Sequence, residues 1–401
     1  MSKVPKLRFK EFSGDWEEKR LGEVAKIIMG QSPNSSAYNE DFEGVPLIQG
    51  NADCKNRKIK VRLYTTEITK KSNRGDIIMS VRAPAGTIAT SNIESCIGRG
   101  VCAIRGKKEA QKFIFQYLIN YEKKWQKYSQ GSTFDSINSN VIKELEVLFP
   151  LLPEQEEISS FLSSVDTKIE KIEKKVELLK QYKKGMMQKI FSQEIRFKDE
   201  NGNDYPDWVE KELGEFGFYI SDGNYGELYP KENQMIETGI PVIRVNNMVN
   251  GSLKWNKLKF ISPELHKVLT SGHLKTGDIL ITTRGQIGLI ALVDKRFHNA
   301  NINAQICLIR TNNILNNIFL HQYLQYEKLQ KECQSLQTGT ALKQLPRKNL
   351  DKLHIQYPIS SLEQEKIANL LSSLDKKIER IEKELEQIKE FKKGLLQQMF
   401  V

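Results

Sequence analysis

Residues 154–191 read EQEEISSFLSSVDTKIEKIEKKVELLKQYKKGMMQKIF, and residues 363–400 read EQEKIANLLSSLDKKIERIEKELEQIKEFKKGLLQQMF. The two stretches align without a gap, and more than half of their positions are identical. Each follows a much longer block whose sequence is far less similar between the two copies. The chain is therefore predicted to consist of two copies of one unit. A two-fold protein with a basic balance suits a two-fold partner, and duplex DNA is the commonest partner of that kind.

Both stretches carry apolar residues at alternating steps of four and three. They run from Ile158 to Leu179 in the first stretch and from Ile367 to Ile388 in the second, with glutamate and lysine between them. This heptad spacing predicts two long helices that pair with each other as a coiled coil. Pro153 favours a helix start, and the glutamates after it complement the positive end of the helix dipole.

The blocks before the helices are weaker copies of each other. LRFKEFSGDWEEKRLGEV (7–24) parallels IRFKDENGNDYPDWVEKELGEF (195–216), and RGDIIMSVRAPAG (74–86) parallels TGDILITTRGQIG (276–288). Short apolar runs bounded by glycine predict strands, whereas 111–128 and 317–335 have the apolar spacing of helices. Each block is therefore predicted to be a mixed α/β domain, in which turn geometry explains most shared glycines.

The order of these segments predicts a circular repeat. The L/I-R-F-K segment follows the first helix at Ile195, yet it also opens the chain at Leu7. The simplest closed arrangement has antiparallel helices with one domain at each end. The predicted fold class is therefore α+β: two mixed α/β domains joined by two long antiparallel coiled-coil helices, pseudo-two-fold and circularly arranged. The predicted boundaries are 1–152 and 194–361 for the domains, and 153–193 and 362–401 for the helices.

Bulk composition favours an intracellular protein with a polyanionic partner. The chain has 401 residues, a net charge of +11 and five cysteines, without a C-x-x-C pair. An odd set of isolated cysteines predicts reduced thiols in a cytoplasmic protein, not disulfides or a zinc site. We find no signal peptide and no apolar run of membrane-spanning length, so no membrane partner is expected.

A catalytic constellation is missing from the sequence. There is no D/N-P-P-Y/F motif of the kind that N6-adenine methyltransferases use to hold an extruded base, and no G-x-x-x-x-G-K-S/T phosphate loop. PDWVEK (206–211) is only superficially like a nuclease metal site, because Glu210 and Lys211 are adjacent. The sequence therefore predicts a binding protein that is not an enzyme and holds no metal.

Candidate DNA contacts are polar residues on predicted loops. Arginine and lysine neutralise phosphate, arginine binds guanine through two hydrogen bonds, and asparagine and glutamine bind adenine in the same way. The first-domain candidates are Gln31, Ser32, Asn34, Asn51, Lys55, Arg57, Arg82, Ser132 and Thr133. The second-domain candidates are Asn224, Tyr225, Arg244, Asn246, Asn247, Arg284, Gln286 and Thr340. Arg82 and Arg284 are the strongest, because the repeat makes them equivalent; a structural salt bridge to an aspartate is the alternative.

Several motifs resemble the specificity subunit of type I restriction–modification systems over essentially the whole chain. They are PEQEE and LEQEK at the helix starts, the doubled D-x-K-I-E-x-I core, the K-K-G end, and G-D-I…R…G in each block. The resemblance implies that the blocks are target recognition domains, each reading one half of a split, asymmetric site on double-stranded DNA. It also implies that the helices set the unread spacer and dock two modification subunits.

The same resemblance assigns catalysis to partner subunits. Modification subunits would methylate adenine with S-adenosylmethionine, and restriction subunits would use ATP and Mg²⁺, so no cofactor is expected on this chain. Two alternatives remain: a coiled-coil adaptor that binds only proteins, and a self-contained methyltransferase or nuclease, which would need the missing motifs. The sequence does not give the recognised bases or the spacer length.

Overall fold

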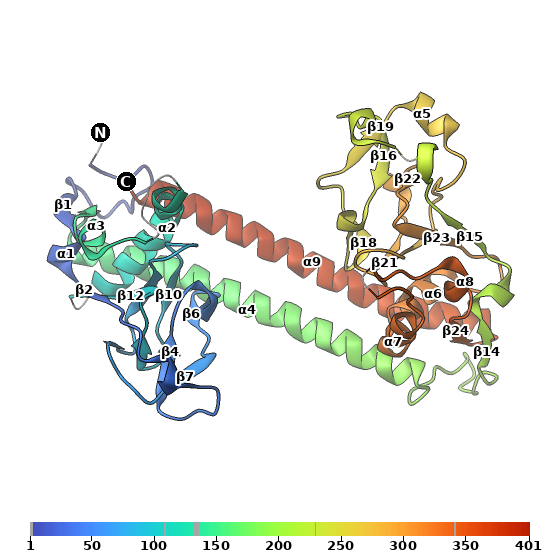
Figure 1. The fold of residues 1–401 in the computed structure, drawn as a ribbon, viewed down its shortest axis with the longest axis horizontal. Coiled ribbons are helices and arrows are strands. Elements are labelled where there is room, and N and C mark those ends of the chain that lie inside the picture. Colours follow the sequence, from blue (N-terminus) through green and yellow to red (C-terminus); the bar gives the residue numbers. More distant parts are fainter. Residues whose placement is uncertain (1–2, 108–109, 131–135, 229, 341) are drawn as a thin grey trace. The chain divides into compact units, whose positions relative to one another are not determined.

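The computed structural model describes residues 3–107, 110–130, 136–228, 230–340 and 342–401 (Figure 1). It divides into two compact units, which are described separately below. Unit 1 comprises Met1–Lys174 and Lys383–Val401, and unit 2 comprises Lys175–Glu382. The division falls inside the two long helices, α4 (Leu152–Phe191) and α9 (Ser361–Met399). Each unit therefore holds one α/β domain and one part of each long helix.

The unit 1 domain combines short strands with three helices. Its strands are β1 (Glu17–Arg20), β2 (Ala25–Met29), β3 (Tyr38–Asn39), β4 (Val45–Ile48), β5 (Cys54–Lys55), β6 (Lys58–Ile59), β7 (Leu63–Thr65), β8 (Lys71–Ser72), β9 (Ile77–Ser80), β10 (Ile88–Thr90), β11 (Ser95–Ile97), β12 (Val101–Gly106) and β13 (Glu146–Phe149). Its helices are α1 (Leu21–Val24), α2 (Ala110–Gln130) and α3 (Ser139–Lys143). The sheets have the orders β2-β12-β9-β10-β6-β5, β3-β7-β4-β11-β8 and β1-β13.

The unit 2 domain repeats this plan. Its strands are β14 (Val209–Glu212), β15 (Tyr219–Asp222), β16 (Ile240–Ile243), β17 (Met248–Val249), β18 (Gly251–Leu253), β19 (Lys259–Ile261), β20 (Ile279–Thr282), β21 (Ile290–Leu292), β22 (Asn301–Ile302), β23 (Ile306–Arg310) and β24 (His354–Tyr357). Its helices are α5 (Pro263–Val268), α6 (Asn317–Leu324), α7 (Glu327–Ser335) and α8 (Arg347–Leu350). The sheet β15-β23-β20-β21-β18-β17 matches the six-stranded sheet of unit 1 strand for strand.

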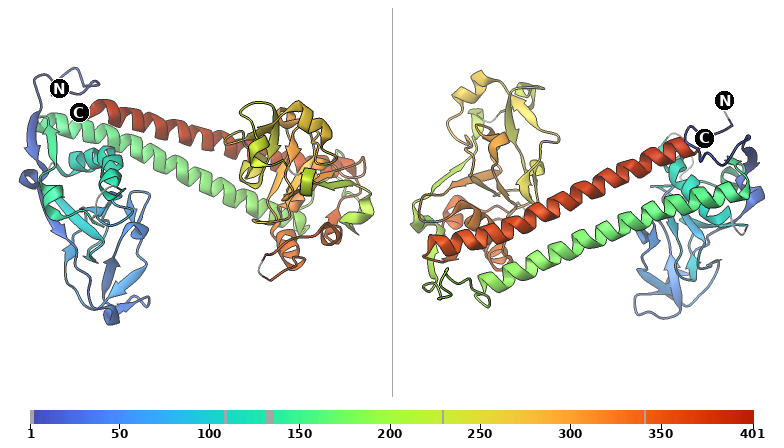
Figure 2. Two further views of the ribbon diagram at one scale, coloured as in Figure 1. Left: turned by 45° about the horizontal axis from the view of Figure 1, so that its top comes forward. Right: turned by 180° about the vertical axis from the view of Figure 1, so that it is seen from behind.

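The long helices are antiparallel within each unit, where they lie side by side (Figure 2). In unit 1, Lys392 Nζ lies 2.6 Å from a carboxylate oxygen of Asp166, and Lys389 pairs with Glu173. In unit 2, the equivalent lysine of the other helix, Lys183, lies 2.6 Å from Asp375. The heptad residues between these pairs are mostly buried, as a coiled-coil seam requires. The predicted fold class is thereby confirmed.

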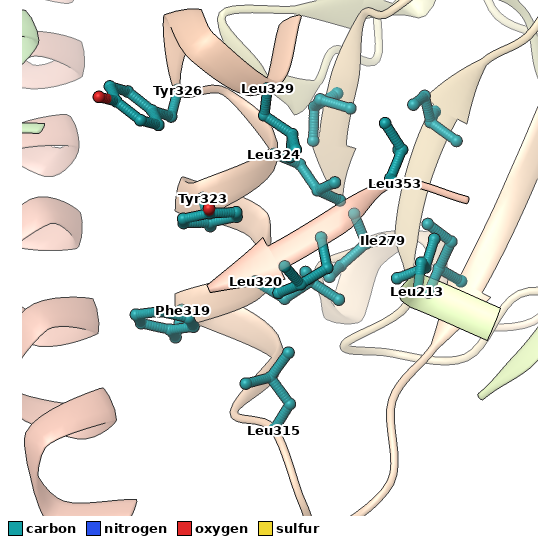
Figure 3. Close-up of a cluster of buried hydrophobic side chains, with 14 of the residues drawn as sticks. Leu213, Ile279, Leu315, Phe319, Leu320, Tyr323, Leu324, Tyr326, Leu329 and Leu353 are labelled. Carbon is teal, nitrogen blue, oxygen red and sulfur yellow. The ribbon is translucent and has the colours of Figure 1, made fainter. Parts of the chain in front are cut away.

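Aromatic residues join each domain to the end of one helix. In unit 2, Phe191 at the end of α4 packs edge-on against Tyr323 and Phe319 of α6, with ring centroids 5.0 and 6.0 Å apart. Figure 3 shows these α6 side chains in one cluster with Leu213 and Leu353. In unit 1, Phe400, which directly follows α9, takes the same place beside α2. These contacts explain why the repeated helices end on the same residue type.

One predicted helix differs from the structure. The sequence predicted a single helix over 317–335, but α6 ends at Leu324 and α7 begins at Glu327. The break places Tyr326 and Leu329 in the core, where both are buried (Figure 3). A straight continuation would follow one helical stripe, whereas the turn directs a second set of apolar side chains inward.

A buried carboxylate explains the repeated L/I-R-F-K opener. Glu154 near the start of α4 is 1% exposed and accepts two 2.7 Å hydrogen bonds from the Arg8 guanidinium and one from the indole of Trp16. In unit 2, Arg196 and Trp208 make the same contacts to Glu363. The hydrogen bond and charge of Glu154 raise the pKa of Arg8. The first glutamate of each helix is therefore an ion-pair partner, in addition to its predicted dipole role.

Within the described residues, none of the helices combines the length and apolar character needed to cross a membrane.

Candidate nucleic-acid interface

Three loops meet at one end of the six-stranded sheet in unit 1. They follow β2 (residues 30–34), follow β9 (81–87) and connect β11 to β12 (98–100). The Gly30 amide donates to Val101 O at 3.0 Å, and the Val81 amide donates to Gly100 O at 2.9 Å. We call these segments the unit 1 loop cluster. Strands that end side by side thus bring residues 30, 81 and 100 together although they are far apart in the sequence.

Unit 2 forms the equivalent cluster from residues 223–227, 283–289 and 303–305. The Gly223 amide donates to Ile306 O at 3.4 Å, and the Thr283 amide donates to Gln305 O at 2.8 Å. Thr338 and Gln344 exchange backbone hydrogen bonds of 2.8 and 2.9 Å, and Gln344 forms a bridge with Arg284, which places both residues beside these loops. Residues 223–227, 283–289, 303–305, 338–340 and 342–344 are called the unit 2 loop cluster.

The loops after β9 and β20 are shaped by the same two devices. The Ser80 hydroxyl donates to Pro84 O and accepts from the Thr87 amide, both at 2.9 Å. The Thr282 hydroxyl closes the unit 2 loop in the same way. Gly86 has φ +90°, and a Cβ there would lie 2.5 Å from Trp125 Cβ. Gly86 is therefore required by backbone conformation and by space, whereas Gly288, with φ +87°, is required by backbone conformation.

The aspartates of that motif are occupied by other arginines. Asp76 accepts hydrogen bonds of 2.7 and 2.8 Å from Arg105 of β12. Asp278 accepts bonds of the same lengths from Arg310 of β23. Both arginine pKa values are raised, mainly by these hydrogen bonds. Among the described residues, Arg82 and Arg284 therefore form no salt bridge with the aspartate of their own motif.

Arg82 and Arg284 are exposed and lie at matching places in the two loop clusters. Arg82 forms an antiparallel bridge with Ser136, and Arg284 forms one with Gln344. Among the residues that the structure describes, neither guanidinium has an ion-pair partner. Their donor groups are therefore available to phosphate or base oxygens.

Arg284 is additionally stacked on an aromatic ring. Its guanidinium carbon lies 5.0 Å from the ring centroid of Tyr225. The Tyr225 hydroxyl donates to Ala304 O at 3.1 Å, which fixes the ring at both ends. Burial, followed by the charge of Asp222, raises the pKa of this phenol, so it stays neutral and donates at physiological pH.

The other first-domain candidates are spread over several sites. Gln31 and Asn34 are exposed in the loop cluster, while Ser32 is half-buried and accepts from the Arg99 amide. Asn51 is half-buried at a 3₁₀ turn, and Lys55 is exposed on β5.

Arg57 contacts Glu122 through two hydrogen bonds of 2.5 and 2.9 Å, which favours a structural role, and its contact with DNA stays a prediction. Ser132 and Thr133 lie outside the described residues.

Two second-domain candidates hold the fold together. Asn224 is buried; its amide donates to Ser271 O and its oxygen accepts from the Thr270 amide. Asn247 is fully buried and closes a turn by accepting from the Arg244 amide and donating to Asn256 O. Both side chains are hydrogen-bonded within the protein, which favours a structural role, and their base contacts stay a prediction.

The remaining second-domain candidates keep accessible polar groups. Arg244 is half-buried and donates to Lys257 O. Asn246, Gln286 and Thr340 are exposed, and the last two belong to the unit 2 loop cluster. The structure adds three exposed residues that sequence analysis missed: Arg99, Gln305 and Lys343. Arg99 lies between Gly98 and Gly100. Its place among the loops follows only from the positions of β11 and β12, so the two glycines alone did not indicate it.

The described residues contain no group of three or more histidine, cysteine, aspartate or glutamate side chains arranged to hold a metal ion. The geometry is that of two exposed, arginine-bearing loop surfaces on matching scaffolds. Such surfaces suit recognition of a polyanion through backbone charge and base edges.

The model of the type I restriction modification DNA specificity domain matches the chain twice, over residues 13–181 and 205–390. The chain is 26% identical over 419 residues to the type I restriction enzyme MjaVIII specificity subunit of Methanocaldococcus jannaschii, covering 97% of this chain and 94% of that protein. It is 37% identical over 192 residues to the putative MjaX specificity subunit of the same organism, covering 47% of this chain and 45% of that protein.

Among solved structures, the S subunit of a type I restriction–modification system from M. genitalium matches with a TM-score of 0.62 at 19% identity, covering 99% of both chains. This likeness shows that the two chains share a fold.

Proposed function

Because the chain belongs to the type I restriction modification DNA specificity family, we propose that it is the DNA sequence-specificity subunit of a type I restriction–modification complex. In this proposal, unit 1 and unit 2 each read one half of a split, asymmetric site. The observation that carries it is the pair of loop clusters. They are built on strands in the same order, yet they expose different side chains.

The long helices are proposed to dock two modification subunits and to set the spacer between the half-sites. Support comes from their near identity, since identical scaffolds suit identical partners. Leu178, Tyr182 and Phe391 on these helices are 51%, 55% and 56% exposed. Large exposed side chains of this kind mark protein-contact surfaces more often when several lie on one element.

Catalysis is assigned to the partners. Modification subunits would transfer the methyl group of S-adenosylmethionine to adenine, and restriction subunits would hydrolyse ATP with Mg²⁺. The chain itself would contribute recognition only, which agrees with the missing base-extrusion and phosphate-loop motifs.

Reconstitution with modification subunits tests the proposal. We expect the purified chain alone to transfer no methyl group, and the mixture to methylate adenines at one split motif. Methylation by the isolated chain would overturn the non-catalytic assignment. Its DNA affinity should fall steeply between two salt concentrations, because phosphate contacts release counterions. A protein-only adaptor would instead show no salt-dependent DNA binding and would leave the methylated sequence unchanged.

A further inference from the structure

Arg284 differs from an ordinary surface arginine because Tyr225 restricts the conformation of its side chain before any ligand binds. An arginine side chain normally loses rotamer freedom when it binds, which weakens the interaction. Here the ring of Tyr225 supports the guanidinium at 5.0 Å. The ring is itself fixed by the 3.1 Å hydrogen bond from its hydroxyl to Ala304 O.

The backbone under both side chains is also held. Gly223 must be glycine, because a Cβ there would lie 2.5 Å from the carbonyl of Asn303. The loop that carries Arg284 is tied to its neighbours by the Thr283 amide and by the Leu345 amide, which donates to Thr283 O at 2.9 Å. Tyr225 and Arg284 therefore approach each other from two loops whose backbones contact neighbouring segments.

The guanidinium keeps its hydrogen-bond donors. The nearest motif carboxylate, Asp278, is already paired with Arg310 at 2.7 and 2.8 Å. Gln286 and Gln305 are exposed in the same loop cluster. Glutamine amides offer both a donor and an acceptor, which suits base edges better than phosphate.

The equivalent place in unit 1 is built differently. Counting from Gly30, the counterpart of Gly223, the position of Tyr225 is taken by Ser32, whose hydroxyl oxygen accepts from the Arg99 amide at 3.2 Å. Arg82 has no ring beside it among the aromatic contacts of the described residues. The aromatic support is therefore a property of unit 2.

We propose that Tyr225 is a positioning residue that holds Arg284 for bidentate recognition of one guanine in the half-site read by unit 2. This inference rests on the proposed function. A guanidinium is planar and carries parallel N–H groups along its edge, and the Tyr225 ring restricts where that edge can lie. Guanine offers a matching pair of acceptors, O6 and N7, in the major groove. A phosphate also offers two acceptors, so the experiment separates a base from the backbone.

The test uses the complex assembled with modification subunits, after its half-sites have been mapped by sequencing methylated DNA. Each guanine of the half-site assigned to unit 2 is replaced in turn by 7-deazaguanine, which removes N7 but keeps base pairing. We expect one replacement to weaken binding by about 5-fold or more. The same replacement should have no effect on the Arg284→Ala complex.

Substitutions of Tyr225 test the positioning role. Tyr225→Leu leaves Arg284 in place but removes the ring, and we expect it to lose about 5- to 10-fold of the discrimination at that one base pair. Tyr225→Phe keeps the ring but removes the hydrogen bond to Ala304 O, so it should retain more of the discrimination than Tyr225→Leu does. Affinity for unrelated duplex should be unchanged in both variants, and thermal unfolding confirms that they are folded. Arg82→Ala is the matched control, because it should alter only the other half-site.

Three outcomes would overturn the inference. Uniform weakening of all duplexes by Arg284→Ala, with a shallower salt dependence, would identify a phosphate contact. Unchanged discrimination in Tyr225→Leu would remove the positioning role. A unit 2 half-site without a sensitive guanine would refute the guanine assignment. Failure of the proposed function would give another result than these three outcomes. In that case the complex without any substitution would methylate DNA without a sequence motif.

Discussion

Unit 1 and unit 2 share their buried polar contacts but not their exposed loops. The pair Arg8–Glu154 in unit 1 is repeated as Arg196–Glu363 in unit 2. Gln116 donates to Asp166 in unit 1 at 2.9 Å, and Gln322 donates to Asp375 in unit 2 at 2.7 Å. Buried polar groups are costly unless satisfied, so both copies must keep the same partners.

The differences lie where the scaffold ends. Ser32 in unit 1 stands where unit 2 has Tyr225, and Arg99 stands where unit 2 has Ala304. Neither position is constrained by a buried partner of the sheet core. The comparison teaches that one fold can keep its internal contacts while presenting two different polar surfaces.

Exchanging one domain is the change with the largest expected effect on the difference between the two units. We expect that replacing residues 1–152 with the matching block of another such subunit changes one half of the methylated motif and leaves the other half unchanged. The reason is that each loop cluster is built entirely within its own unit. Sequencing of methylated DNA measures this result; a change in both halves, or in neither, would show that the units do not read independently.

Lengthening one helix should change the spacer but neither half-site. Four residues inserted after Val176 add about 6 Å at ~1.5 Å per residue. DNA rises ~3.4 Å per base pair, so we expect the unread spacer to lengthen by about one or two base pairs. Local unwinding can absorb the heptad shift. Methylated sites of an active variant provide the measurement, and an unchanged spacer would restrict the helices to docking partners.

Removing either buried glutamate should destabilise the protein to a similar extent. Glu154→Ala and Glu363→Ala each leave an arginine and an indole without their acceptor, so we expect a loss of about 3–5 kcal/mol in the free energy of unfolding. Urea denaturation measures it. Glu156→Ala and Glu365→Ala are matched controls, because these exposed neighbours should change stability by less than about 0.5 kcal/mol. Very different losses in the two units would contradict their equivalence.

The buried histidine His321 should make unit 2 the more acid-sensitive unit. His321 occupies the position of Phe115 in unit 1, and burial lowers its pKa from 6.5 to about 4. Between these values the unfolded chain binds a proton that the folded chain does not, so stability falls as the pH drops from 6.5 towards 4.

Comparison of urea denaturation at pH 7 and pH 5 tests the effect of His321. We expect this histidine to contribute about 2 kcal/mol to the loss of unfolding free energy. His321→Phe should shrink that pH difference, even if it lowers stability at pH 7 by removing the 2.9 Å hydrogen bond to Gly251 O. His298→Gln, at an exposed position, should leave the difference unchanged. An equal pH response in wild type and His321→Phe would refute the prediction.

The long helices and the doubled domains could be predicted because their signals are local and periodic. A heptad pattern and a repeated G-D-I segment are readable without knowing what they contact. The same applies to the antiparallel pairing, which followed from the position of the L/I-R-F-K segment in both copies.

The individual site residues could be predicted only in part, because a polar residue on a loop can either contact a ligand or stabilise the loop itself. Asparagine favours both base contacts and turn closure, and Asn224 and Asn247 serve the second purpose. Arg57 pairs with Glu122, which is distant in sequence, so no local signal distinguishes it from Arg82. Arg99 was missed because only the pairing of β11 with β4, and of β12 with β2 and β9, places it among the loops.

The start of the chain packs onto the last turn of α9. Leu7 N donates to Gln398 O at 2.9 Å, and in unit 2 the equivalent bond runs from Ile195 N to Lys189 O along continuous chain at 3.1 Å. Residues 7 and 398 thus meet at a junction that is non-covalent in unit 1, whereas the equivalent residues of unit 2 are joined by continuous chain. A short linker that joins the segment before Leu7 to the segment after Gln398 should therefore preserve the fold and raise the free energy of unfolding, since it restricts the unfolded chain. A new opening could then be made near residue 193 without loss of either recognition surface.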